Sequence, residues 1–117
     1  MRTDAVEDVT VLSMDDVLWL HTDTIDIDGG SHVVRDYGLL NAAVAMPPQQ
    51  FGGESLHKDL PTMAAASLFH IAHNHLFVDE NTRAAVLSTL AYLSLNGAGK
   101  LPDPQDLESI IRQLRTG

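Results

Sequence analysis

The sequence predicts an all-α fold. Residues 62–71 and 84–95 form two alanine-rich, apolar segments of helical length, and Leu107, Ile110, Ile111 and Leu114 follow helical i, i+3, i+4, i+7 spacing. Residues 84–95 are apolar nearly all round, which is typical of a buried helix. We therefore expect a compact helical bundle around this central helix.

The first predicted helix begins after Ser13. Asp16 stands at the capping-box position three residues later, and we expect the helix to run to about Thr22. Trp19, the one tryptophan of the chain, is predicted to pack in the core. Residues 24–34, with the sequence DGG at 28–30 between Ile and Val pairs, are expected to form a small hairpin or a long loop.

The remaining elements are bounded by capping and helix-breaking residues. Asp36 is expected to cap a second helix that ends at about Met46, before two prolines. Residues 49–58 have no periodicity, which favours a surface loop. Asp59 and Pro61 predict the start of a third helix, and residues 96–97, Asn-Gly, predict the end of the central one.

Composition limits the classes of function. The length of 117 residues suits a single domain, 1–117. The chain contains no cysteine, so it has neither disulfides nor thiolate metal sites. The formal charge of −9 argues against nucleic-acid binding, and no apolar run predicts a membrane span. With no signal-peptide pattern at the N-terminus, we expect a cytoplasmic protein.

Polar residues crowd between the two most apolar segments, where the sequence HLFVDENTR occupies residues 75–83. A helix that begins near Asn81 offers unpaired N–H groups and a positive dipole to an anion, and Arg83 adds a forked donor. Asp79 is an oxygen ligand of the type that Mg²⁺ prefers beside phosphates. His75, at the other lip of the turn, suits a general base. The combination indicates phosphoryl or nucleotidyl transfer.

Simpler interpretations stand beside this one. Asp79 or Asn81 would serve equally as a helix cap, with Glu80 stabilised by the helix dipole and Arg83 solvated. A transition-metal site formed by His70, His73 and His75 is a further alternative. For His70, which lies in an apolar run, a hydrogen-bonded core position is the better interpretation.

The segment 75–83 resembles the Fic/Doc motif, H-x-F-x-[D/E/N]-[G/A]-N-[K/G]-R. His75, Phe77, Asp79, Asn81 and Arg83 match its defining positions. Residues 34–43, VRDYGLLNAA, followed by two prolines and FGGE at 51–54, resemble the death-on-curing (Doc) branch of that family. The resemblance extends from about residue 12 to residue 97.

The resemblance implies a Fic-type helical bundle that transfers AMP or phosphate from ATP or another nucleotide, with Mg²⁺, to a hydroxyl of a protein substrate. His75 would be the base and Asp79 the Mg²⁺ ligand. Asn81 and Arg83 would contact phosphate, and Phe77 would anchor the loop in the core. The family's strand-like flap would lie within residues 49–58.

Glu80 and Thr82 depart from the motif, although by position both belong to the nucleotide- and phosphate-binding loop. The family has a small residue in place of Glu80 and a Lys or Gly in place of Thr82. Glu80 either points to solvent as an ordinary first-turn acid or occupies the anion site and pairs with Arg83, and the scarcity of local cations favours the second outcome. These departures support an alternative function, a catalytically degenerate Fic-fold interaction module.

The Doc branch also implies a toxin of a toxin–antitoxin pair. Family members that restrain themselves carry the pattern [S/T]-x-x-x-E-[G/N], which this chain lacks. An antitoxin-like inhibitor is therefore expected to act in trans.

Overall fold

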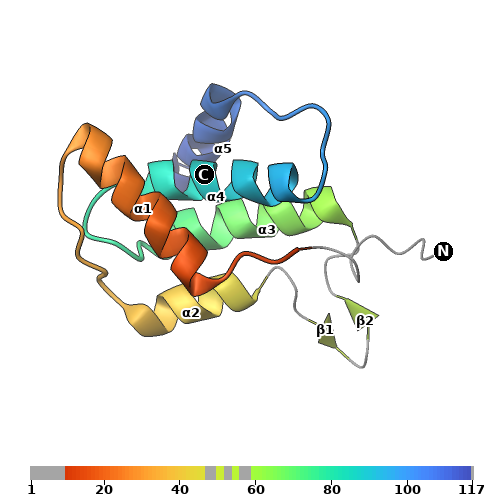
Figure 1. The fold of residues 1–117 in the computed structure, drawn as a ribbon, viewed down its shortest axis with the longest axis horizontal. Coiled ribbons are helices and arrows are strands. Elements are labelled where there is room, and N and C mark those ends of the chain that lie inside the picture. The colour runs from red at the N-terminus through yellow and green to blue at the C-terminus, as the bar shows by residue number, and fades with distance from the viewer. Residues whose placement is uncertain (1–9, 47–49, 52–53, 56–58, 117) are drawn as a thin grey trace.

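The computed structural model describes residues 10–46, 50–51, 54–55 and 59–116. Its helices are α1 (Met14–Asp28), α2 (Tyr37–Ala45), α3 (Leu60–His73), α4 (Asn81–Leu95) and α5 (Pro104–Thr116). The strands β1 (Gln50–Phe51) and β2 (Glu54–Ser55) form a minimal antiparallel pair (Figure 1). The predicted all-α fold class is confirmed.

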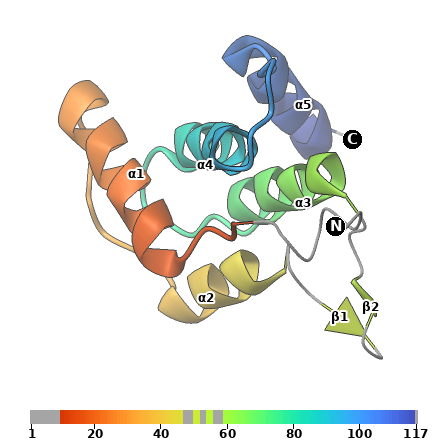
Figure 2. The same ribbon diagram turned by 45° about the vertical axis from the view of Figure 1, so that its right-hand side comes forward.

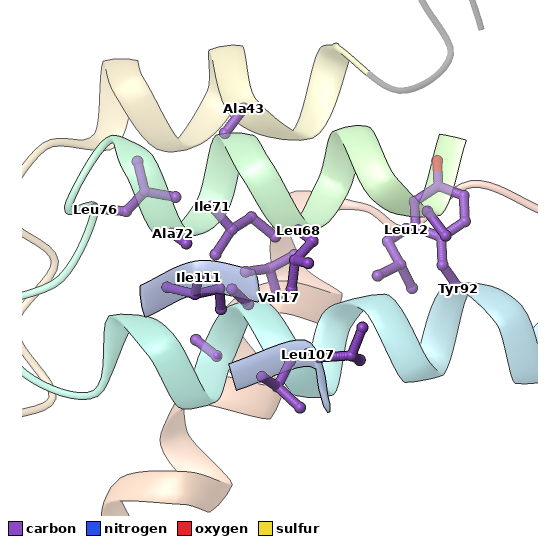
Figure 3. Packing of buried hydrophobic residues seen from close by; sticks show 14 of the residues in the cluster. Leu12, Val17, Ala43, Leu68, Ile71, Ala72, Leu76, Tyr92, Leu107 and Ile111 are labelled. Carbon is purple, nitrogen blue, oxygen red and sulfur yellow. The ribbon is translucent and has the colours of Figure 1, made fainter. Parts of the chain in front are cut away.

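Helix α4 is the centre of the bundle. It contacts α1, α3 and α5, and Figure 2 shows it between α1 and α5. Ala84 and Ala85 are fully buried, and such small side chains let neighbouring helices approach closely. One cluster of buried side chains draws on all five helices, including Leu107 and Ile111 from α5 (Figure 3). The predicted central helix is therefore confirmed.

The predicted helix starts agree with the structure. Ser13 and Asp16 form both hydrogen bonds of a capping box at α1, 3.1 and 2.8 Å long. Asp36 accepts the Leu39 N–H at α2, and Asp59 does the same for the Thr62 N–H at α3. No helix of the described ranges is long and apolar enough to cross a membrane.

The predicted end of the first helix and the hairpin after it were wrong. Helix α1 continues beyond Thr22 to Asp28, because Thr24 and Ile25 are buried against the bundle. It ends at Gly29, whose φ of 86° is readily adopted only by glycine. The described strands lie instead in the connector 49–58, where the flap was expected; the rest of that connector is outside the described residues.

The prediction that Trp19 is a core residue was also wrong, since its side chain is 67% exposed. Val17 and His21 define the buried face of α1. Trp19 lies two residues from each, about 200° around the helix, and therefore faces outward.

Candidate functional site

The turn between α3 and α4, residues 74–80, carries most of the candidate site. His75 and Glu80 adopt left-handed backbone conformations, with φ of 49° and 65°, which are uncommon for residues with a side chain. Between them, Leu76 and Phe77 are buried in the core. The two left-handed residues thus flank the buried pair. The polar side chains of the turn stay at the surface, outside the core.

The segment before α2, residues 33–36, forms a strap that holds this turn against the bundle. Val34 and Phe77 form an isolated antiparallel bridge, and the Arg35 N–H donates to the Leu76 carbonyl at 2.7 Å. The Arg35 guanidinium also donates to the carbonyls of His75 and Asn74, at 2.7 and 3.1 Å. It supplies positive charge where the dipole of α3 is negative.

Asp79 is fixed by the loop that follows α1. Its Oδ2 accepts the Ser31 N–H at 2.8 Å. A Cβ at Gly30, where φ is 114°, would lie 3.2 Å from two side-chain atoms of Asp79. The approach of this loop to Asp79 therefore depends on glycine.

His21 of α1 holds the same turn from inside the core. Its ring stacks on Phe77 with centroids 3.7 Å apart and planes within 7°. Its Nε2 lies 2.8 Å from the Asp79 carbonyl oxygen, which can only accept, so Nε2 donates this hydrogen bond. Burial lowers the pKa of His21 below 6.5, although the bond to the Asp79 carbonyl opposes this.

The start of α4 lacks the side-chain cap found at α1, α2 and α3. Its N-cap is Glu80, which makes no capping hydrogen bond, so the alternative interpretation of Asp79 or Asn81 as the helix cap was wrong. The Ala84 N–H makes a helical bond to the Glu80 carbonyl at 3.0 Å. The N–H groups of residues 81–83 precede that bond and have no intrahelical acceptor.

Asn81 is engaged inside the turn. Its amide oxygen accepts the Phe77 N–H at 2.9 Å, and its amide nitrogen donates to the Phe77 carbonyl at 2.8 Å. The Asn81 side chain therefore holds the turn in this structure, and its own backbone N–H is the group at the helix start.

A pocket of about 560 Å³ brings the predicted site residues together. It is lined by His75, by residues 78–83, by Asp28 of α1 and by Glu108 of α5. Asp28 and Glu108 were not predicted as site residues. Four acids therefore share the pocket with one arginine, and their negative charges disfavour a bare anion there.

Arg83 pairs with Asp28 across 3.2 Å. The expected pairing of Glu80 with Arg83 was therefore wrong: α1 extends far enough to bring Asp28 to the guanidinium. Burial raises the pKa of Glu80 above 4.5, and a hydrogen bond with Asp28 and its negative charge act in the same direction. The Arg83 charge opposes that rise.

The alternative transition-metal site finds no support. Among the described residues, no group of three or more His, Asp or Glu side chains could hold a metal ion. The ring of Phe69 packs on both His70 and His73, with centroids 5.1 and 5.0 Å apart. Asp79 nevertheless suits Mg²⁺ carried by a nucleotide, because such an ion needs only one or two carboxylates beside phosphate oxygens and water.

Comparison with known proteins decides the family. The model of the Fic/DOC family matches residues 11–93. This chain belongs to the Fic/DOC family. The match includes α1, the strap at residues 33–36 and the whole motif, whereas α5 and its Glu108 lie beyond it.

A curated relative agrees with this assignment. Over 69 residues the chain is 45% identical to "Toxin Doc" of Mycolicibacterium smegmatis (strain ATCC 700084 / mc(2)155). The aligned part is 59% of this chain and 53% of the relative, so the chain matches about half the length of that protein. No solved structure gave a significant match.

Three residues that contact or support the candidate site of this Fic/DOC chain were not predicted from the sequence. They are His21, Asp28 and Gly30. Asp28 and Gly30 were assigned to a small hairpin or a long loop. A lone His in an amphipathic helix has no distinguishing pattern. Their role depends on α1 lying beside the start of α4, a long-range contact that local sequence does not encode.

His21 should make the stability of this Fic/DOC chain pH-dependent. Because its pKa is lowered on folding, the unfolded chain binds a proton more readily, and the free energy of unfolding should fall as the pH drops below about 6.5. His21→Phe keeps a ring against Phe77 but cannot titrate, so its urea-denaturation midpoint should change less between about pH 7.5 and pH 5.5. His73→Phe, at an exposed position, is the control and should behave like the parent. An equal loss in the parent and in His21→Phe would contradict this assignment.

Proposed function

We propose that this chain is a Fic/Doc-type transferase that moves AMP or phosphate from a nucleotide to a hydroxyl of a protein. The observation that carries the proposal is one pocket shared by His75, by the uncapped start of α4 and by Arg83. Family membership supports it independently.

Each group in the pocket would have its own role. The N–H groups at the start of α4 and the Arg83 guanidinium would hold the phosphates of the nucleotide. As the hydroxyl oxygen of the target bonds to phosphorus and the bond to the leaving phosphate breaks, His75 would take the hydroxyl proton. His75 is exposed in the pocket and accessible to such a target.

Asp79 would hold Mg²⁺ that arrives with the nucleotide, and the ion would offset negative charge on the phosphates. The charges of the pocket support this proposed requirement. Asp28, Asp79, Glu80 and Glu108 line it, and their charges would repel a nucleotide that came without a cation.

His75→Ala should abolish transfer of label from ATP, radiolabelled at the α- or the γ-phosphate, to a protein in a bacterial lysate. Loss of a general base typically lowers a rate by about 10² to 10⁴. His73→Ala is the matched control, since His73 is a nearby exposed histidine that does not line this pocket. The α label tests AMP transfer and the γ label tests phosphate transfer. If His75→Ala labelled the same targets at the parent's rate, the mechanism would be wrong.

We further propose that the chain acts as a toxin, as the name of its relative suggests, and that an antitoxin-like protein inhibits it in trans. The expected consequence is growth arrest on expression in a bacterial host, relieved by His75→Ala. Arrest that persisted in His75→Ala would contradict a toxicity that depends on catalysis.

A second candidate function is a non-enzymatic interaction module that retains the Fic fold. The Asp28–Arg83 ion pair favours it, because a phosphate would have to displace the Asp28 carboxylate from the guanidinium. Calorimetry with ATP and Mg²⁺ separates the two functions, since a module of this kind would bind no nucleotide.

Removing negative charge beside Arg83 should strengthen nucleotide binding. Asp28→Asn and Glu80→Gln should each lower the Kd for Mg²⁺–ATP by roughly two- to fivefold, as expected for a partly exposed charge pair. Glu80→Gly should do at least as well, because glycine also suits the φ of 65° there, and adding Thr82→Lys should lower the Kd further.

Asp23→Asn is the control for these variants, since it removes the same charge from an exposed position of α1 outside the pocket. If the Asp28 and Glu80 variants bound Mg²⁺–ATP no better than Asp23→Asn, both acids would be bystanders.

A further inference from the structure

The outer face of α1 presents an aromatic side chain among carboxylates. Trp19 is 67% exposed, although it is the largest side chain of the helix. Asp15, Asp23 and Asp26 are exposed and lie four residues before, four after and seven after it, on the same face. Helix α1 contains no lysine or arginine. An exposed Trp side chain is costly to leave in water and commonly marks an interaction surface.

This face continues into an apolar groove between α1 and the C-terminal half of α4. The groove has a volume of about 280 Å³, and its lining includes Leu12, Trp19, Leu20, Ala91 and Leu95. Leu95, at the end of α4, is 57% exposed. Asp16 also lines the groove. Trp19 belongs both to the groove and to the face of α1 that carries Asp15, Asp23 and Asp26, so these aspartates form an acidic rim beside the apolar floor. A docking partner has to match both the floor and the rim.

We propose that this groove docks a basic amphipathic helix of another protein, with apolar residues on the Trp19–Leu95 floor and Lys or Arg beside Asp15, Asp23 and Asp26. The helical form follows from the shape, because a groove between two helices accepts an amphipathic helix. The basic charge follows from complementarity with the rim.

The negative charge of this face also argues against two other occupants, a second copy of the chain and its own residues 1–9. In a second copy of the chain the same face would bring the α1 aspartates against each other, and like charges across an interface oppose association. Residues 1–9 of this chain contain Asp4, Glu7 and Asp8 against one arginine, so they do not complement the rim.

The groove is separate from the candidate nucleotide site. It lies at the C-terminal end of α4, whereas the motif lies at the N-terminal end, about 20 Å away for a helix of this length. Docking is therefore independent of the proposed function. His75→Ala should bind the partner helix as well as the parent does, so failure of either proposal is distinguishable from failure of the other.

The test uses a synthetic amphipathic peptide of about 18 residues, with leucines on one face and lysines on the other. Trp19, as the one tryptophan of the chain, reports binding directly. We expect its fluorescence to shift to the blue as the peptide covers it, with an affinity that weakens as salt is raised. A peptide with glutamate in place of each lysine should not bind.

Variants separate a specific site from general attraction to an acidic protein. Trp19→Ala keeps the charge and should weaken peptide binding, measured by calorimetry, by about tenfold or more. The triple variant Asp15→Asn, Asp23→Asn, Asp26→Asn should also weaken it, by roughly tenfold. Asp103→Asn with Asp106→Asn, which neutralises acids at the start of α5, is the control and should change it little.

Circular dichroism should show unchanged helix content in these variants, because every altered side chain is exposed. The proposal is overturned if the peptide does not bind or if Trp19→Ala binds it as tightly as the parent. It is equally overturned if the α5 variant loses as much affinity as the α1 variant, or if light scattering shows a dimer that Trp19→Ala dissociates.

Discussion

The hydrogen bond from the His21 imidazole to the Asp79 carbonyl, with the stack of that ring on Phe77, ties the end of the α3–α4 turn to α1. The turn includes left-handed residues at both ends, a conformation that the local sequence does not favour. It persists because outside groups determine it: Arg35 holds its first carbonyls, Asn81 holds Phe77, and the loop after α1 holds Asp79. Such external support is expected of backbone strain at a functional site.

Because the turn is held in this way, α4 begins without a side-chain cap on its first N–H groups. In each of α1, α2 and α3 a Ser or Asp side chain accepts one N–H of the first helical turn. At α4 the N-cap side chain does not, and these groups face a pocket that also contains Arg83. The same helix that carries His21 under the turn extends to Asp28 and brings this acid to Arg83. One helix thus supports the turn before α4 and places an acid beside Arg83.

Much of the fold was predictable because its signals are local. The Ser13, Asp36 and Asp59 caps and the all-round apolarity of α4 each depend on a few neighbouring residues, and the structure confirms them. The errors arose where tertiary contacts determine the length of a helix or the direction of a side chain. Burial of Ile25 extended α1 through a segment that resembled a turn, and the phase of that helix, set by Val17 and His21, turned Trp19 outward. The motif located most of the pocket, but it could not reveal Asp28 and Glu108, which reach the pocket from distant elements.

The central claim is that the first N–H groups of α4 form the phosphate site. The most direct measurement is a titration of the ¹⁵N-labelled protein with ATP and Mg²⁺, followed through the backbone amide resonances. We expect the largest shifts at Asn81, Thr82 and Arg83, with smaller ones at His75. Saturable shifts confined to other parts of the protein, with these amides unmoved, would contradict it.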